Sequence, residues 1–166
     1  MTGTLVLGLG NPLMGDDGAG IAALELLREE WELPEAVELV DGGTWGLNLL
    51  PLVESFERVV LLDAVHADAR PGTLLLLSRD ELPRYFAQKL SPHQIDLREV
   101  LALAELRGKL PPTVLVIGVQ PERVEWHAGL SAPVEQAIAK LVALTLDQLQ
   151  WLGHPCRSRR EKLCHA

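Results

Sequence analysis

Aromatic residues and cysteines are both scarce in this chain. Phe, Trp and Tyr together make up 4% of the 166 residues, so a folded core has to be built mainly from Leu, Val, Ala and Ile. The two cysteines, Cys156 and Cys164, lie close to the C-terminus, and neither their position nor their spacing suggests a structural disulfide. This use of cysteine indicates a reducing compartment, and we expect a cytoplasmic protein.

Long hydrophobic runs are missing too. No stretch reaches the roughly 18 consecutive apolar residues that a membrane-spanning helix needs, so we expect no membrane as a partner. Residues 1–4 lack the basic start of a secretory signal peptide, and the apolar stretch that follows them is too short for one.

Positive charge is the third shortage. Lys and Arg number 15 against 23 Asp and Glu, which gives a net charge of −8. The last 13 residues carry four basic residues and one acid, so the part before His154 carries −11. An acidic body repels phosphate backbones, which argues against nucleic acid as the main partner. The composition predicts one domain over residues 1–153 and a flexible basic tail over residues 154–166.

Aliphatic sequence in short runs is abundant. Hydrophobic types make up 48% of the residues. Five runs are apolar almost throughout, the pattern of strands covered on both faces, namely residues 4–9, 37–40, 58–62, 73–77 and 113–119. Helical patterns occupy residues 20–31, 47–55, 95–106 and 133–151. This alternation predicts a three-layer α/β/α sandwich around a five-stranded sheet.

The connection between the third and fourth strands predicts the direction of the fourth. Residues 65–72 contain Pro71 and Gly72 and show no helical pattern. Eight residues are too few for the crossover of about a dozen that a parallel pair needs. We therefore expect the fourth strand to be antiparallel and the sheet to be mixed but mostly parallel.

Acidic residues follow three of these strands. Asp16 and Asp17 come shortly after the first strand, Asp41 follows the second and Asp63 follows the third. Ligands of open α/β sheets gather at the carboxyl ends of the strands, so these acids are candidate site residues. A later segment, SPHQ at 91–94, adds His93 as a candidate from a helix start.

The loop after the first strand also admits a structural interpretation. Asp16 would cap the following helix, and Asp17 would complement its dipole. A dinucleotide fingerprint is excluded, because Leu13 stands where its third glycine belongs and two carboxylates would repel a pyrophosphate. For the Asp-Gly-Gly sequence at 41–43, a sharp turn is the simplest interpretation.

Asp63 and His93 each have a structural and a functional interpretation. A carboxylate that ends a buried strand is costly unless it is paired or bound to a metal, so Asp63 either caps a nearby turn or faces the crevice. The SPHQ segment is typical of a helix start with a capping box, and a helix N-terminus keeps His93 neutral. Asp17, Asp63 and His93 would together offer two oxygens and one nitrogen to a divalent ion such as nickel or zinc.

Taken in order, these segments resemble the hydrogenase maturation endopeptidases. The resemblance rests on GLGNPLMGDDGAG at 8–20, DGGT at 41–44, LLDA at 61–64, SPHQ at 91–94 and IGVQPE at 117–122. It runs from about residue 5 to residue 149. Each motif alone is weak, whereas the ordered set is specific.

The resemblance implies a phosphorylase/hydrolase-like fold and an aspartic-type endopeptidase. Such an enzyme removes a short C-terminal extension from the large-subunit precursor of [NiFe] hydrogenase after nickel has been inserted, and so activates another enzyme. The family's metal positions carry over to Asp17, Asp63 and His93, with Asp16 as the alternative acid at the first of them. A functional role carries over to Asp41. The nickel is supplied by the substrate precursor.

The chemistry of cleavage and two other functions stay open at this point. Water activated by a carboxylate such as Asp17 or Asp41 would break the peptide bond, or the ion itself would polarise it. A non-catalytic nickel-binding maturation chaperone would use the same three ligands. GLGNP also resembles the opening of peptidyl-tRNA hydrolase, an esterase, but that family needs a histidine soon afterwards and residues 18–27 contain none.

Overall fold

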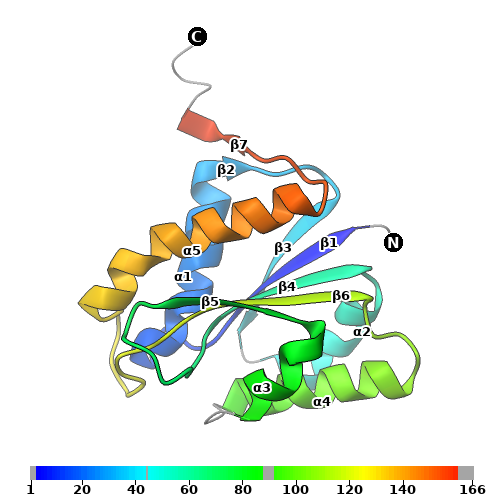
Figure 1. Cartoon of the computed structure of the whole chain (residues 1–166), viewed down its shortest axis with the longest axis horizontal. Coiled ribbons are helices and arrows are strands. Elements are labelled where there is room, and N and C mark those ends of the chain that lie inside the picture. Colours follow the sequence, from blue (N-terminus) through cyan, green and yellow to red (C-terminus); the bar gives the residue numbers. More distant parts are fainter. Residues whose placement is uncertain (1–2, 44, 88–91, 161–166) are drawn as a thin grey trace.

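The computed structural model describes residues 3–43, 45–87 and 92–160, without the side chains of residues 92–96. Its centre is a five-stranded sheet in the order β3-β1-β4-β6-β5 (Figure 1). Strands β1 (Thr4–Leu9), β3 (Val37–Gly43), β4 (Arg58–Ala64) and β6 (Thr113–Val119) are parallel, and β5 (Leu74–Ser78) runs antiparallel to β6. The predicted mixed sheet and the direction of its fourth strand are confirmed.

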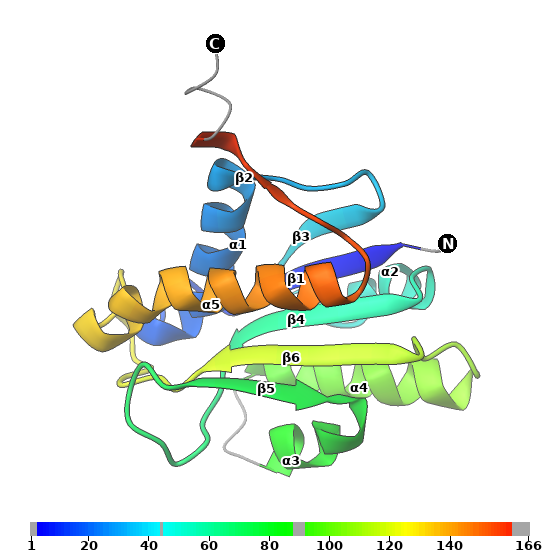
Figure 2. The same cartoon turned by 45° about the horizontal axis from the view of Figure 1, so that its top comes forward.

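Helices cover both faces of the sheet (Figure 2). Helices α1 (Ala19–Glu30) and α5 (Ala132–Trp151) pack on one face. The other face carries the 3₁₀ segment η2 (Gly46–Leu49) and helices α2 (Leu50–Glu54), α3 (Leu82–Ala87) and α4 (Pro92–Leu106). This confirms the predicted three layers.

The helices differ from the predictions in two details. The helix predicted over residues 47–55 is divided into η2 and α2, with a proline at the start of α2. The 3₁₀ segment η3 (Arg79–Glu81) and helix α3 were not predicted, because three and six residues are too few to show a helical period.

Alternate side chains of each strand enter different cores, as strand geometry requires. On β1, Leu5 and Leu7 pack on the face of α4, whereas Val6 packs on the face of α1, and all three are fully buried. Both cores are predominantly aliphatic, as the low aromatic content predicts.

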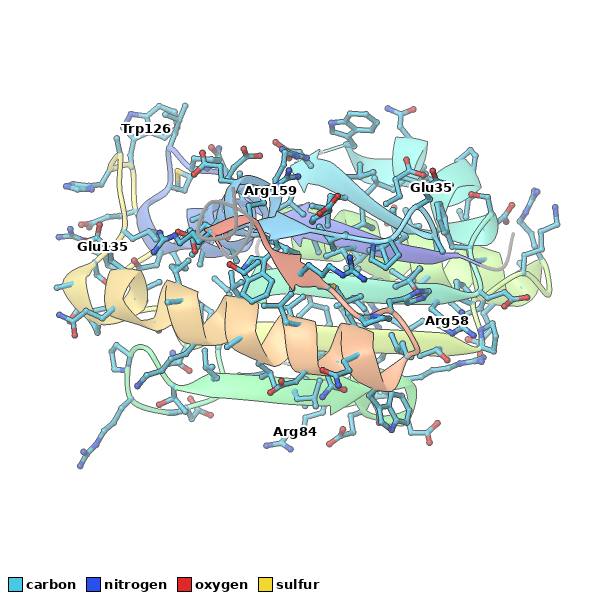
Figure 3. The ribbon with its side chains drawn as sticks, turned by 90° about the horizontal axis from the view of Figure 1, so that it is seen from above. Glu35, Arg58, Arg84, Trp126, Glu135 and Arg159 are labelled. Atoms are coloured by element: carbon cyan, nitrogen blue, oxygen red, sulfur yellow. The ribbon has the colours of Figure 1, made fainter. Side chains whose placement is uncertain are left out.

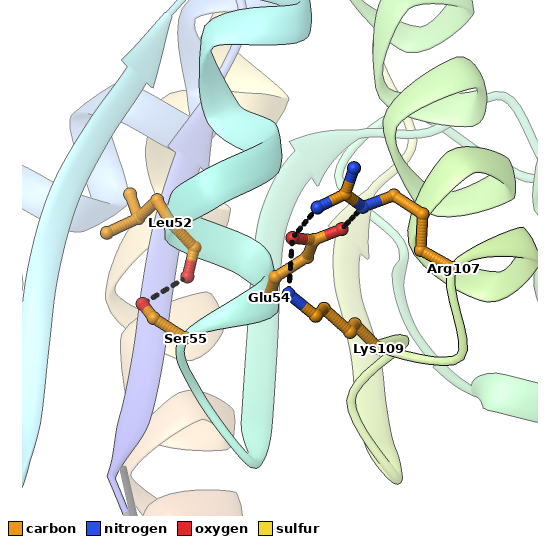
Figure 4. Close-up of polar contacts among 5 residues, drawn as sticks. All are labelled: Leu52, Glu54, Ser55, Arg107 and Lys109. Carbon is orange, nitrogen blue, oxygen red and sulfur yellow. Dashed lines mark hydrogen bonds and ion pairs between the residues drawn. The ribbon is translucent and has the colours of Figure 1, made fainter.

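A cluster of charges fastens α2 to the end of α4 (Figure 4). The Glu54 carboxylate accepts hydrogen bonds from Arg107 Nε at 2.5 Å and from Arg107 Nη2 at 3.3 Å, and Lys109 Nζ lies 3.8 Å from it. Ser55 Oγ donates to the Leu52 carbonyl oxygen at 2.7 Å where α2 ends. The Glu54 side chain is only 9% exposed, so the bidentate ion pair between Arg107 and Glu54 is better shielded from solvent than an ordinary surface ion pair.

The first part of the tail is attached to the body, which differs from the predicted flexible segment. Strand β7 (Arg157–Ser158) pairs antiparallel with β2 (Trp31–Glu32), and Arg159 Nε donates to the Trp31 carbonyl oxygen at 3.0 Å. Arg160 also pairs with Glu30. Composition alone indicates a polar tail and gives no information about partners that lie more than a hundred positions away.

His154 is the buried anchor of this tail. Its Nε2 lies 2.8 Å from Thr4 Oγ1, at hydrogen-bond distance, where β1 begins. Burial, and secondarily the charge of Arg58, lowers the pKa of His154 below its ordinary value of 6.5. The ring is therefore neutral in the fold at neutral pH. As the pH falls, His154 is protonated in the unfolded chain before it is protonated in the folded chain. The stability that the neutral His154 contributes is therefore present above about pH 6.5 and is lost as the pH falls.

Deletion of residues 154–166 is expected to lower the melting temperature while leaving cleavage activity in place. The deletion removes β7 and the His154 hydrogen bond, and the described part of it, residues 154–160, contacts β2 and the start of β1 rather than the carboxyl ends of the parallel strands. Each kcal/mol lost corresponds to roughly 2–4 °C for a chain of this size. The pH effect of His154 is tested separately with H154A. The melting temperature of H154A should differ less between about pH 7.5 and about pH 5.5 than that of the parent chain does. An unchanged melting temperature in the deletion, or a dead enzyme, would contradict this prediction.

No helix in the described parts of the chain is both long enough and apolar enough to cross a membrane.

Candidate active site

Three of the predicted acids lie at one edge of the sheet because β1 runs between β3 and β4. Gly8 near the end of β1 is aligned with Asp41 on one side and with Leu62 on the other. The loop that follows β1 and carries Asp17 is therefore flanked by Asp41 at the end of β3 and by Asp63 at the end of β4. This is the carboxyl edge where ligand sites form in open α/β sheets.

Gly20 brings the start of α1 close to this edge. A Cβ atom on Gly20 would lie 2.1 Å from the Leu62 carbonyl oxygen and 2.6 Å from that of Leu9, so only glycine fits between the helix and the two strand ends. The 3₁₀ segment η1 (Gly15–Gly18), which contains Asp17, consequently packs beside β4. The close approach explains how an acid in a loop reaches the neighbourhood of Asp63.

Asp17 lies beneath the turn formed by residues 10–12. The residue is 6% exposed, and its Oδ2 accepts a hydrogen bond from the Asn11 backbone N–H at 2.9 Å. Gly10 has a φ of 108°, and a Cβ atom there would lie 1.8 Å from the Asp17 carbonyl oxygen. The glycine therefore allows the turn to close directly over Asp17 and orient its carboxylate.

Asp16 has a different role from its neighbour. It is fully buried, and its Oδ2 accepts hydrogen bonds from the backbone N–H groups of Glu122 and Arg123 at 2.8 and 3.0 Å. Ser131 donates twice, from its backbone N–H to Oδ1 at 2.7 Å and from Oγ to Oδ2 at 2.8 Å. Burial raises the pKa of Asp16, but these four hydrogen bonds outweigh it and lower the pKa below its ordinary 3.8.

The prediction that Asp16 caps the following helix is wrong. Gly18 occupies the N-cap position of α1, and no side chain caps it. Asp16 is instead the anchor of residues 121–131, which lie more than a hundred positions away in the sequence. Since its carboxylate oxygens are engaged by that segment, Asp17 is the better candidate of the two for contact with a ligand.

The segment anchored by Asp16 stands beside the site. Its His127 forms a parallel bridge with Met14, and the Gly15 N–H donates to the His127 carbonyl oxygen at 2.7 Å. At its tip Trp126 is 77% exposed and projects away from the body (Figure 3). Tryptophan is enriched where proteins contact other molecules, so Trp126 is a candidate contact residue beside the site.

Asp63 is fully buried at the end of β4 and is hydrogen-bonded on both oxygens. Oδ1 accepts from the Ala64 backbone N–H at 2.8 Å, and Oδ2 accepts from the Tyr85 hydroxyl at 2.6 Å. Tyr85 belongs to α3 and was not a sequence candidate. The sequence offered only one signal for it, namely that it is the one tyrosine of the chain. Its partner, Asp63, lies 22 positions earlier, so no local motif connects the two residues.

Asp41 is exposed and borders a cleft. The cleft has a volume of about 370 Å³ and is lined by Gly10, Asn11, Pro12, Asp41, Gly43 and Trp45. Trp45 is 55% exposed at its rim. Strand β3 extends through Gly43, past its predicted end at residue 40, so the Asp-Gly-Gly sequence completes the strand rather than interrupting it. The cleft and Asp17 share the turn at residues 10–12.

His93 is the second residue of α4, which begins at Pro92 as the helix-start pattern predicts. Figures 1 and 2 show that α4 begins near the carboxyl ends of the parallel strands and runs back along the sheet. The His93 side chain and Ser91 lie outside the described residues, so the predicted capping box does too. Among the described side chains, no three His, Cys, Asp or Glu residues gather closely enough to hold a metal ion.

The fold and the position of the acids define an α/β protein with an acidic site at the carboxyl edge of its sheet. Comparison with known proteins is more specific. The model of the hydrogenase maturation protease family matches residues 21–148. The chain belongs to this family.

Individual relatives agree with the family match. The hydrogenase 2 maturation protease of Escherichia coli is 37% identical over 150 residues, which cover 90% of this chain and 92% of the relative. The hydrogenase expression/formation protein HoxM of Azotobacter vinelandii is 40% identical over 151 residues, covering 90% and 73% of the two chains. The structure of the hydrogenase maturating endopeptidase HybD from E. coli superimposes with a TM-score of 0.92 at 35% identity, covering 96% and 99%.

The family assignment makes the chain a hydrolase that acts on peptide bonds and serves hydrogenase maturation. Neither alternative drawn from the sequence is favoured. The relatives named above are a maturation protease and a hydrogenase formation protein, and the structural neighbour named above is an endopeptidase, rather than a carrier or a peptidyl-tRNA hydrolase.

Proposed function

We propose that this chain is a cytoplasmic aspartic-type endopeptidase that removes the C-terminal extension of a nickel-loaded [NiFe] hydrogenase large-subunit precursor. The observation that carries the proposal is the convergence of Asp17, Asp41 and Asp63 at the carboxyl edge, close to where α4 begins. The names of the relatives support it, since they are proteins of hydrogenase maturation. The location rests on the cysteine usage of the chain and stays a prediction.

Nickel recognition falls to Asp17, Asp63 and His93 in this proposal. Two carboxylate oxygens and one imidazole nitrogen suit a divalent first-row ion. The hydrogen bonds to Asp17 and Asp63 hold both carboxylates in place before the substrate arrives, so little ordering is needed on binding. The ion enters as part of the precursor, whose own cysteines keep it, and three ligands from the enzyme still leave coordination positions for them.

The extended C-terminal segment of the precursor then lies in the cleft beside Asp41. Hydrolysis adds water to the scissile carbonyl carbon, breaks the C–N bond and returns a proton to the leaving amine. We assign the proton-accepting role to Asp41, because it is exposed in the cleft, whereas Asp17 is covered by the turn at residues 10–12. The nickel anchor positions the carbonyl, so a precursor without nickel lacks the contact that fixes the bond over Asp41.

Incubation with purified precursor tests the proposed function. Nickel-loaded precursor should lose the mass of its C-terminal extension in a time course followed by mass spectrometry. The same precursor prepared without nickel is the control and should keep its mass. Intact nickel-loaded precursor after prolonged incubation would contradict the proteolytic assignment, and equal cleavage of both forms would contradict nickel recognition.

H93A is expected to fold and to be inactive on the nickel-loaded precursor. The substitution removes one of the three proposed ligands, and loss even of a group that only supports a ligand costs about 10–100-fold. Circular dichroism checks folding, and the mass shift of the precursor checks cleavage. An unfolded H93A would favour the purely structural interpretation of the SPHQ segment, in which His93 belongs to a helix start.

A further inference from the structure

We propose that Tyr85 is a positioning residue that holds Asp63 in the orientation in which it binds the nickel of the precursor. The inference rests on the proposed function and extends it to a residue that neither the motifs nor the family comparison singles out. Its basis is the contact between the Tyr85 hydroxyl and Asp63 Oδ2, at 2.6 Å.

The geometry of this contact is that of a strong hydrogen bond. A distance of 2.6 Å is typical of a hydroxyl that donates to a charged carboxylate. Asp63 is 0% and Tyr85 1% exposed, so water does not compete for either group, and the bond is stronger than it would be at the surface. The contact joins the end of a central strand to a helix from a different part of the chain.

Hydrogen bonds from Ala64 and from Tyr85 restrain the two oxygens of Asp63 separately. The bond from the Ala64 N–H to Oδ1 comes from the next residue and holds one oxygen against the strand. The bond from Tyr85 comes from α3 and holds the other, so rotation of the carboxylate about its Cβ–Cγ bond is blocked. A carboxylate restrained in this way keeps its oxygens directed at one point in space.

The ring of Tyr85 has a separate role, which phenylalanine would also fulfil. It packs in the core on the α4 face, with its centroid 4.6 Å from that of Phe86. The hydroxyl contributes nothing to this apolar contact. Removing the hydroxyl alone therefore separates the positioning of Asp63 from the filling of the core.

Groups that orient metal ligands usually affect metal affinity or activity by about 10–100-fold when they are removed. We expect Y85F to reduce kcat/KM for the nickel-loaded precursor by this factor. The loss should appear mainly as a higher KM, because the contact between nickel and Asp63 exists already in the bound substrate and persists through the reaction.

The experiment compares Y85F with the parent chain and with T145V. Thr145 is fully buried in α5, and its Oγ1 donates to the Leu141 carbonyl oxygen at 2.8 Å, so T145V removes a buried hydroxyl on the other face of the sheet. Thermal melts establish a temperature at which all three proteins are fully folded. Initial rates on nickel-loaded precursor are then measured there over a range of concentrations.

The expected result is a raised KM in Y85F and parental kinetics in T145V, with both variants slightly less stable than the parent. Parental kcat/KM in Y85F would overturn the proposal and leave Tyr85 a core residue, and so would an equal loss in T145V. Failure of the parent chain to cleave the precursor would instead refute the proposed function, so the two failures are distinguishable.

Discussion

D63N is expected to fold like the parent chain and to lose cleavage of the nickel-loaded precursor by a factor of about 10²–10³. The substitution keeps the size and shape of the side chain and removes its negative charge. The amide oxygen can still accept from the Ala64 N–H, and the amide nitrogen can donate to the Tyr85 hydroxyl oxygen, so a hydrogen bond to each of these two neighbours is kept. What is lost is an anionic oxygen ligand for the ion.

Mass spectrometry of the precursor measures this loss, and circular dichroism checks the fold. D147N is the matched control, because Asp147 is an exposed acid on α5 and the same substitution there should leave cleavage unchanged. Full processing by D63N would refute the role of Asp63. A large drop in melting temperature would show that the carboxylate serves mainly to stabilise the end of β4.

D16N is expected to destabilise the protein by about 2–4 kcal/mol and to abolish cleavage with it. Four hydrogen bonds converge on the Asp16 carboxylate, and an amide offers one oxygen and one NH₂ group in its place. At least one buried N–H donor then faces another donor, and the remaining bonds lose the carboxylate charge. The segment 121–131 loosens, and so does the 3₁₀ segment that carries Asp17.

Urea unfolding gives the free energy of unfolding for D16N and for its control, S131A. The control removes one of the four hydrogen bonds and leaves the carboxylate, so its loss should be only about 1 kcal/mol. Because the pKa of Asp16 is lowered in the fold, its contribution is present above about pH 3.8 and declines as the pH falls. On acidification, D16N should therefore lose less of its free energy of unfolding than the parent chain loses. Equal stabilities of D16N and S131A would contradict this account.

The sheet and its direction could be predicted because the information is local. The runs at residues 4–9 and 113–119 coincide with β1 and β6, since a strand buried on both faces has to be apolar along its whole length. The antiparallel direction of β5 followed from the length of one connection. Placing Asp17, Asp41 and Asp63 at one edge needed only the rule that parallel strands end on the same side.

Residues whose role depends on distant partners could not be predicted. Asp16 and Asp17 are chemically the same and adjacent, so the sequence left both as candidates. Only the packing of residues 121–131 onto Asp16 separates a structural acid from a candidate ligand. Tyr85 and His154 were missed for the same reason, because their partners, Asp63 and Thr4, lie 22 and 150 positions away.

By itself, then, the sequence determined the order along the chain of the five strands of the main sheet and of the longer helices, the aliphatic core and the edge at which the acids gather, because hydrophobic period and connection length are properties of short segments. The tertiary structure alone decided which acid is anchored from afar, which hydroxyl restrains Asp63, and that the basic tail is attached as far as residue 160. Those outcomes depend on hydrogen bonds between segments that meet only once the chain has folded.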